Sequence, residues 1–456
     1  VNTTGAGGCF TSLQAAIDNA TTVNGDTITV AANTGAAPAY DERVVVSKNV
    51  TIIGAGATSI LDGGQQGGIG TTLTVNTGIT TSVSGLVIRN GSASNVANAG
   101  TLTLTNDTIT GASNGLAGQG GGINNTGVLF LVASTISNNT ASFEGGAMIN
   151  NGTMTLTNST ISGNQVTGMG GTSSGGVIDQ GAGATVINST ISNNQSTGYF
   201  ATGTAAVMAN TIIAGNGPST SADVAGNFSS GGYNLIGKAD GVTTFTGTGD
   251  QTGTIAAPID PKLGPLQSNA PGVTPTQALL TGSPALDKIP SVGGCNGANV
   301  TTDQRGVTRP QPAGGLCDIG AYEAQASVPA PTITAVSPSS GGTAGGNHVT
   351  LTGTGFQSGA TVKVGANAAT SVTVVNSTTI TVTAPAGSAG TVSVTVTNPD
   401  SGTFTLPNAY TYGVVKTPPQ PRAGGGTGGG SPPSLPGGRS SPASGGSPNP
   451  IPVPRG

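Results

Sequence analysis

The sequence predicts an all-β protein: a right-handed parallel β-helix, then an immunoglobulin-like β-sandwich and a disordered tail. Three observations lead to this prediction. Only 7% of the 456 residues are charged and 79 are glycine, a composition that suits stacked strands joined by tight turns. A strand-like unit recurs at intervals of 20 to 30 residues in the first half of the chain. After residue 331, segments of strict apolar–polar alternation replace that unit.

The repeat is clearest in five segments between residues 101 and 213. Aligned on a shared Thr-Ile step, they place one isoleucine of each segment in a single column: Ile109, Ile136, Ile161, Ile191 and Ile212. The spacings are 27, 25, 30 and 21 residues, and an earlier copy places Ile88 another 21 residues before the first. A strand–turn–strand unit of this length is one coil of a parallel β-helix. Each coil buries its apolar face against the coils above and below, about 4.8 Å away.

The alignment predicts columns of like side chains along the stack. A threonine column contains Thr108, Thr135, Thr160, Thr190 and Thr211. An asparagine ladder, in which each side-chain amide bonds the next, is expected at Asn139, Asn164 and Asn194. A second asparagine column, at a turn, contains Asn106, Asn158 and Asn188. The inward positions are Leu104, Leu131, Leu156 and Val186.

Paired glycines precede three of these strands, beginning at Gly121, Gly145 and Gly175, and we expect them to permit positive φ at a corner of the coil. One pair begins the phrase Gly145-Gly-Ala-Met-Ile149, which is followed by Ile161-Ser-Gly-Asn164. This pattern resembles the GGAI…FxxN repeat of chlamydial polymorphic outer membrane proteins and related bacterial β-helices, with Ile in place of the usual Phe. We assign the β-helix repeats to residues 46–233.

Residues 1–45 are expected to cap the first coil. Apolar residues at helical spacing predict a short amphipathic helix, and they are Leu13, Ala16, Ile17 and Ala20. The surrounding segment 11–20 resembles the SLREAI-type motif of exported β-helix proteins. A helix at this end covers strand edges that would otherwise be unpaired. The first strands are expected at residues 26–30, 43–46 and 50–53.

The repeat fades over residues 234–326, where five motifs occur in order. They are Asn234-Leu-Ile-Gly237, Asp260-Pro-Lys-Leu-Gly-Pro-Leu266, Gly282-Ser-Pro-Ala-Leu-Asp287, Asp303-Gln-Arg-Gly306 and Cys317-Asp-Ile-Gly-Ala-Tyr-Glu323. This series resembles the C-terminal part of the "choice-of-anchor" family of bacterial surface β-helix proteins. The resemblance implies that the segment closes the β-helix before variable attachment modules. It also implies that Asp303 and Arg305 belong to a capping salt bridge or hydrogen-bond set.

Residues 331–413 are predicted to form the β-sandwich. Alternating segments at 349–352, 361–364, 371–374, 379–382 and 391–396 have the spacing of an immunoglobulin-like fold. The phrases Ile333-Thr-Ala-Val-Ser-Pro338 and Ala409-Tyr-Thr-Tyr412, with the Gly-Gly-Asn-His phrase at 345–348, resemble an IPT/TIG domain. Residues 414–456 are rich in Pro, Gly and Ser and are expected to be a disordered linker or tail.

Three cysteines are present. Cys295 and Cys317 lie 22 residues apart, and a disulfide between them is expected in an exported protein, where it would contribute about 3 kcal/mol. Cys9 is left without a partner, and three free thiols are the alternative. The chain begins with Val and has no N-terminal export signal, so we expect a mature or trimmed chain. No apolar run is long enough to span a membrane.

Charge and residue placement disfavour several functions. The net charge of −4 and the lack of a basic patch disfavour nucleic acid as a partner. Residues 91–237 contain no Lys, Arg or His, and their acids are scattered over different coil positions: Asp107, Glu144, Asp179 and Asp223. Lyase or glycosidase chemistry needs clustered acids or a nearby base. We therefore expect that the protein is not an enzyme and has no cofactor.

Three remaining features have alternative interpretations. Glu144 and Asp179 flank glycine corners and either bind Ca²⁺ or are solvated turn residues. His348 is expected to be a solvent-facing strand residue. Threonine rows raise ice binding, but Phe130 interrupts the column of Thr103, Thr155 and Thr185, so a flat threonine lattice is not predicted.

The preferred functional hypothesis is a secreted bacterial cell-surface protein with a structural or adhesive role. The β-helix would be a stalk or display surface that contacts other copies, other surface proteins or extracellular glycans. Contacts between copies would assemble it into a fibre or coat. The alternative is an extracellular carbohydrate-binding or carbohydrate-active protein of the pectate-lyase-like kind. Both rest on architecture and resemblance rather than on an identified site.

Overall fold

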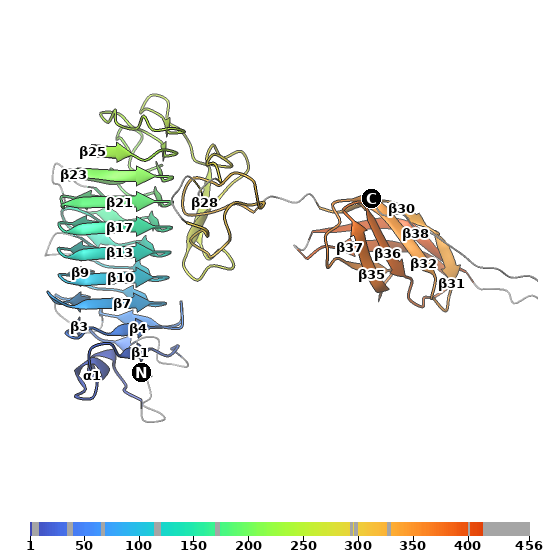
Figure 1. Cartoon of the computed structure of the whole chain (residues 1–456), viewed down its shortest axis with the longest axis horizontal. Helices are drawn as coiled ribbons and strands as arrows, with labels where there is room; N and C mark the ends of the chain where they lie inside the picture. Colours follow the sequence, from blue (N-terminus) through green and yellow to red (C-terminus); the bar gives the residue numbers. More distant parts are fainter. Residues whose placement is uncertain are drawn as a thin grey trace, which may run out of the picture. The chain divides into compact units, whose positions relative to one another are not determined.

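The structure is a computed structural model that describes residues 1, 9–33, 40–64, 69–113, 120–168, 174–291, 295, 300–325, 330–399 and 402–413. The chain divides into two compact units, Val1–Ser327 and Val328–Gly456. The first unit is a parallel β-helix of about eight turns together with a segment packed on its side, and the second is an immunoglobulin-like sandwich (Figure 1). The all-β prediction is confirmed.

Three columns of parallel strands form three faces of the β-helix. The first face contains β1 (Thr27–Thr29), β4 (Thr51–Ile53), β7 (Thr80–Ser84), β10 (Thr101–Thr105), β13 (Val128–Val132), β17 (Thr153–Thr157) and β21 (Gly183–Ile187). The second contains β2 (Tyr40–Asp41), β5 (Ile60–Asp62), β8 (Val87–Arg89), β11 (Thr108–Thr110), β14 (Thr135–Ser137), β18 (Thr160–Ser162), β22 (Thr190–Ser192), β24 (Ile212–Ala214), β26 (Leu235–Ile236) and β27 (Gln251–Thr252). The third contains β3 (Val44–Val46), β6 (Thr71–Val75), β9 (Ser94–Asn98), β12 (Ile123–Asn125), β16 (Met148–Asn150) and β20 (Val177–Asp179).

Two long strands complete the stack. β23 (Tyr199–Ala209) pairs with both β20 and β21, so it joins the first and third faces into one sheet. β25 (Val224–Ser230) pairs with β23. A short sheet of β15 (Thr140–Ala141) and β19 (Gln165–Val166) lies beyond the second face. The second face continues to Thr252, past residue 233, where the sequence repeat fades.

Alternation of side chains explains the core. The central residue of each short strand on the second face points inward, and successive coils pair Ile88, Ile109, Ile136, Ile161 and Ile191 in register, all fully buried. The predicted inward residues Leu104, Leu131, Leu156 and Val186 are also fully buried. Apolar columns of this kind stabilise the stack because every coil removes the apolar surface of its neighbours from water.

The predicted isoleucine column is wrong at its last member, Ile212. Ile191 pairs with Ile213, not Ile212, and Thr190 pairs with Ile212. Thr211 therefore lies outside the threonine column. The physical reason is that β24 is buried on both sides: Ile213 lies in the core of the β-helix, whereas Ile212 lies in a second apolar cluster outside it. A Thr-Ile motif alone does not distinguish these two isoleucines.

Both ends of the stack are covered. Helix α1 (Leu13–Asp18) begins after Ser12, whose side chain accepts a hydrogen bond from the Ala15 amide, and it buries Leu13, Ala16 and Ile17 against the core. Ala20, predicted to be on the same apolar stripe, lies beyond the end of the helix and is exposed. At the other end, the aromatic rings of Tyr199, Phe228 and Phe245 pack together, with centroids 5.8 and 5.3 Å apart.

Residues 260–325, called here the outer segment, pack on the second face beside the stack (Figure 1). Their regular structure is a hairpin of β28 (Leu263–Gln267) and β29 (Thr276–Leu279). Apolar residues of the outer segment form a cluster with residues of the second face, and the main members are Ile212, Ala214, Leu235, Leu279, Ala285, Ile289 and Ile319. The outer face of β24 and β26 is thus buried rather than exposed to solvent.

The sandwich has two sheets. One contains β30 (Thr332–Ser337), β32 (His348–Thr354), β36 (Thr379–Thr383) and β35 (Thr370–Asn376). The other contains β31 (Ser340–Gly342), β38 (Thr403–Gly413), β37 (Gly390–Thr397), β33 (Thr361–Val364) and β34 (Asn367–Ala368). The five predicted strands lie within β32, β33, β35, β36 and β37. His348 is exposed at the start of β32, as expected. The predicted tail, residues 414–456, lies outside the described residues.

The paired glycines have the predicted positive φ at only one position. Gly145 has positive φ, whereas Gly121 and Gly175 do not. A Cβ on Gly121 would lie 2.6 Å from the carbonyl oxygen of Gly146, and a Cβ on Gly146 would lie 2.6 Å from that of Gly175. Most of these glycines are therefore required by the close approach of successive coils, not by the sign of φ.

Candidate functional site: buried polar columns and the outer segment

A ladder of side-chain amides lies inside the corner between the second and third faces. Nδ2 of Asn139 donates to Oδ1 of Asn164 (3.0 Å), and Nδ2 of Asn164 donates to Oδ1 of Asn194 (2.8 Å). The ladder extends in both directions, to Asn95 and Asn216, through bonds of 2.8 and 3.0 Å. These amides also donate to main-chain carbonyls of the corner, so those buried carbonyls have hydrogen-bond partners.

A second ladder, which the sequence analysis missed, lies inside the corner between the third and first faces. Its members are Asn98, Asn125, Asn150 and Asp179, joined by side-chain bonds of 2.7, 2.6 and 2.8 Å, and it ends on the hydroxyl of Tyr199. Asp179 is fully buried. The prediction that Asp179 is a solvated turn residue is therefore wrong, because its carboxylate is buried as the last acceptor of this ladder. Its alternative assignment as a Ca²⁺ ligand stays a prediction.

The third corner, between the first and second faces, contains hydroxyls. One serine hydroxyl per coil fills this corner, from Ser134, Ser159 and Ser189. Each Oγ accepts a hydrogen bond from the main-chain amide at the same position of the preceding coil, and it donates to the main-chain carbonyl two residues earlier in its own coil. Thr211 belongs to this column, since its hydroxyl accepts from the Ser189 amide. Asp107 occupies the same position one coil before Ser134, and burial raises its pKa to about 8.

The second predicted asparagine column is a turn column. Asn106, Asn158 and Asn188 have φ of 57°, 47° and 48°. This left-handed conformation favours Asn among residues with a side chain. Asn158 donates to the carbonyl of Thr302 in the outer segment (2.8 Å). These residues therefore form tight turns between the first and second faces rather than an amide ladder.

The threonine column holds the outer segment on the second face. Oγ1 of Thr160 donates to Oε1 of Gln304 (2.6 Å), and Nε2 of Gln304 donates to Oγ1 of Thr135 (2.9 Å). The amide of Ala321 donates to Oγ1 of Thr190 (3.0 Å). These threonines are buried, whereas Thr108 at the end of the column is half-buried. Sequence periodicity predicts the threonine column, but only the tertiary structure shows that residues of the outer segment bond to it.

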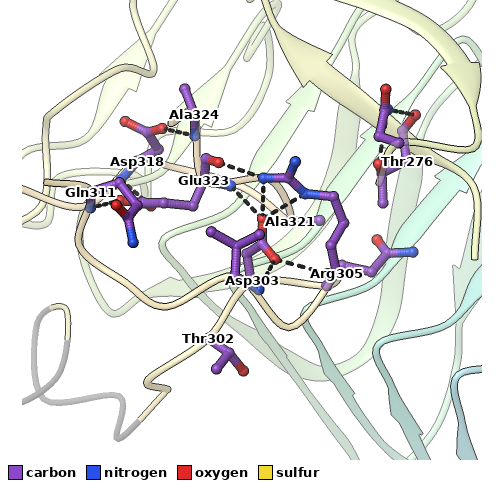
Figure 2. A network of polar contacts seen from close by, with 12 residues as sticks. Thr276, Thr302, Asp303, Arg305, Gln311, Asp318, Ala321, Glu323 and Ala324 are labelled. Carbon is purple, nitrogen blue, oxygen red and sulfur yellow. Dashed lines mark hydrogen bonds and ion pairs between the residues drawn. The ribbon is translucent and has the colours of Figure 1, made fainter. Parts of the chain in front are cut away.

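Asp303 and Arg305 form a buried ion pair (Figure 2). Oδ2 of Asp303 lies 2.7 Å from Nη2 of Arg305 and 2.9 Å from its Nε. The same carboxylate accepts hydrogen bonds from the amides of Arg305, Val307 and Glu323. The guanidinium lies over the ring of Tyr322, 3.5 Å from its centroid. Partners on every side offset the cost of removing both charges from water.

A second buried pair adjoins the first. Nη1 of Arg309 lies 2.8 Å from Oε2 of Glu323, and the guanidinium also donates to the carbonyls of Asp318 and Gly320. Glu323 accepts from the amides of Gln311 and Asp318. Burial raises the pKa of Glu323 to about 7 against the opposing effect of Arg309, and burial lowers the pKa of Arg309.

The disulfide lies next to these pairs. Cys295 and Cys317 are bonded, both are buried, and the carbonyl of Cys295 accepts from Nδ2 of Asn210 on the β-helix (3.1 Å). Cys9 is a free, exposed thiol. Asp318, directly after Cys317, accepts from two main-chain amides, and burial raises its pKa. The disulfide thus ties the outer segment together at the point where it contacts the stack.

These carboxylates act as acceptors within the fold. Among the residues that the structure describes, no group of three or more His, Cys, Asp or Glu side chains is placed to hold a metal ion. Glu144 is half-buried and lies apart from Asp179, so the two residues that the sequence linked to Ca²⁺ occupy different surroundings. In the same described part of the chain, no helix has the length and apolar character needed to span a membrane.

The residues that sequence reasoning missed are Gln304, Arg309, Glu323 and the second ladder. A recurring Asn at the third residue of β12 and β16, Asn125 and Asn150, is a signal for that ladder, but these third-face strands lie outside the five segments that define the repeat. A search of curated proteins finds no match to this chain. The family model for the IPT/TIG domain matches residues 331–412, the extent of the sandwich, so this part of the chain is an IPT/TIG domain.

Proposed function

We propose that this chain is a secreted bacterial cell-surface protein in which the β-helix is a stiff stalk or display surface with a structural or adhesive role. The observation that carries the proposal is the docked outer segment. It covers the second face through threonine contacts, an apolar cluster, two buried ion pairs and a disulfide. A stack that is reinforced along one side and covered at both ends suits a structural role, which depends on a stable and stiff shape.

Two further observations support this role. The IPT/TIG domain is of a kind typical of extracellular proteins. The disulfide is of a kind that persists in oxidising compartments. The motifs that resemble the choice-of-anchor family, Asp303–Gly306 and Cys317–Glu323, provide the buried core of the outer segment. On this basis we propose membership of that family.

We also propose that the protein is not an enzyme and uses no cofactor. The support comes from three of its buried acids, whose carboxylates bond within the fold: Asp179 ends a ladder, Asp303 accepts five hydrogen bonds, and Glu323 accepts three. A general acid or nucleophile needs a reacting atom within hydrogen-bond reach. The oxygens of these three carboxylates already accept hydrogen bonds from main-chain amides and side chains of the chain.

We propose that copies of the chain assemble side by side. End-to-end stacking through strand edges would have to displace helix α1 at one end and the packed aromatic rings at the other. Lateral contact along the uncovered first face needs no such rearrangement. Other surface proteins and extracellular glycans are the remaining proposed partners.

Electron microscopy tests this proposal. Antibodies raised against the purified chain should label the surface of intact cells that produce it, and negative stain of the purified chain should give rods of uniform length. Fibres or a regular coat would make assembly the function. Label confined to the cell interior would overturn the surface role.

A further inference from the structure

A groove runs along the outer corner of the stack, between the second face and the sheet of β15 and β19. It has a volume of about 570 Å³, and four successive coils contribute to its lining. The main lining residues are Asn138, Gly163, Gln165, Asn193, Gln195 and Gly215. Because one coil adds about 4.8 Å along the axis, the groove follows the axis for roughly 15 Å. It is separate from the contacts of the outer segment described above.

One column of the stack alternates between asparagine and glycine, and its last four members line the groove. From one coil to the next it contains Asn90, Gly111, Asn138, Gly163, Asn193 and Gly215, and all six have positive φ. Positive φ explains why only Asn and Gly occur. The alternation has a packing reason as well: a Cβ on Gly163 would lie 2.7 Å from Oδ1 of Asn138, and one on Gly111 would lie 2.9 Å from Oδ1 of Asn90.

The alternation presents a carboxamide at every second coil, about 9.6 Å apart. Gln165 and Gln195 add carboxamides from the neighbouring position of successive coils. The side chains of Asn138, Gln165 and Asn193 are exposed and make no hydrogen bond within the described part of the chain. Each therefore offers one acceptor and two donors to a ligand. No charged side chain lines this groove.

The groove continues into a second cavity of about 270 Å³, since Gly215 and Gly217 line both. The apolar part of its lining consists of Pro258, Ile259 and Pro261, and the exposed acid Asp260 lines the cavity beside them. Opposite charges, Asp223 and Lys238, lie together at its buried side, and Nζ of Lys238 donates to the carbonyl of Asn216 (2.7 Å). The combination is a polar groove that leads to an apolar wall.

From this geometry we infer that the groove binds an extended, uncharged polysaccharide along the axis of the β-helix. The rise of one coil is close to the length of one pyranose in an extended chain, so hydroxyls of alternate sugars meet the carboxamides in register. Carboxamides donate to and accept from hydroxyls equally well, and the absence of charge in the groove disfavours uronates. The apolar wall suits the C–H face of a terminal ring. The inference rests on the proposed adhesive role and names its ligand class.

The test uses the full chain and defined oligosaccharides. Binding of cellohexaose, xylohexaose and mannohexaose, with hexagalacturonate as the charged comparison, is measured by calorimetry. The groove variant is Asn138→Gly/Gln165→Ala/Asn193→Gly, in which glycine preserves the positive φ and matches the residue found in alternate coils. The matched control, Asn151→Ala/Gln180→Ala, removes two exposed carboxamides from another corner of the stack.

We expect at least one neutral hexasaccharide to bind, the groove variant to bind it about tenfold or more weakly, and the control to bind as the parent chain does. Melting temperatures of the variants show that each is folded. Equal loss in groove variant and control, preference for hexagalacturonate, or no binding of any sugar would overturn the inference. If no sugar binds while antibodies still label the cell surface, the surface role stands and the ligand is of another class.

Discussion

The guanidinium of Arg309 lies 2.8 Å from the carboxylate of Glu323, and neither side chain is exposed to solvent. This pair joins a residue just after the Asp303–Gly306 motif to the last residue of the Cys317–Glu323 motif, and it neighbours the Asp303–Arg305 pair. Removing either partner of such a pair would leave the other as an uncompensated buried charge.

Arg309→Met should destabilise the outer segment by about 3–5 kcal/mol, because Glu323 would remain buried without its cation. The double variant Arg309→Met/Glu323→Leu should be more stable than the single variant, since it leaves no buried charge. Urea denaturation and the rate of proteolysis within residues 260–325 measure both effects. The control is Arg89→Met, which breaks the partly exposed pair with Asp62 and should cost about 1 kcal/mol or less. A double variant less stable than Arg309→Met would contradict the charge-burial argument.

The double variant Cys295→Ser/Cys317→Ser should lose about 3 kcal/mol, the loop-closure contribution expected for a 22-residue separation. The loss should appear first as faster proteolysis of the outer segment, because the disulfide lies there and not in the stack. Cys9→Ser is the matched control and should leave stability unchanged, since that thiol is free and exposed. Unaltered proteolysis of the double variant would show that the disulfide has no role in docking.

Asn164→Ala should destabilise the β-helix by about 2–4 kcal/mol. The change leaves the main-chain amide of Asn139 without its acceptor inside a buried corner and breaks both side-chain bonds of the ladder at Asn164. Nδ2 of Asn139 keeps the carbonyl of Ile109, and Oδ1 of Asn194 keeps the main-chain amide of residue 164. Asn151→Ala removes an exposed asparagine of the same coil and should change stability by less than about 0.5 kcal/mol. Denaturant midpoints of the two variants decide the comparison, and equal midpoints would refute the structural role of the ladder.

Stability should fall as the pH rises from 4 to 8. Burial raises the folded pKa of Asp107 to about 8, above its ordinary value of 3.8, so the folded state holds the proton more tightly. The contribution is complete below pH 4 and is lost as the pH approaches 8, at a slope of up to about 1.4 kcal/mol per pH unit. Glu323, with a folded pKa of about 7 raised by burial, acts in the same direction.

Asp107→Ser isolates this contribution, since serine occupies the same column in the next three coils and satisfies the same main-chain amide there. The variant should be more stable than the parent chain at pH 8 and should have a smaller slope between pH 4 and 8. Denaturation curves at a series of pH values measure the slope. An identical slope in parent and variant would exclude Asp107 as its source.

Much of the fold follows from the sequence because stacked coils repeat their local environment. The columns of Ile109, Ile136, Ile161 and Ile191 and the ladder of Asn139, Asn164 and Asn194 recur at one position of each coil. Periodicity alone therefore places them in contact. Strict alternation likewise located the strands of the IPT/TIG domain, because one face of each strand is buried and the other is exposed.

Contacts between non-repeating parts were decided only by the tertiary structure. The sequence does not place Gln304 against Thr135 and Thr160, or pair Arg309 with Glu323, because no period relates these residues. The register of Ile212 failed for the same reason: a second apolar surface, supplied by the outer segment, buries the side of β24 that a solitary coil would expose to water. Repetition determined the stack, and the packing of an aperiodic segment on one of its faces determined which repeated residues became an interface.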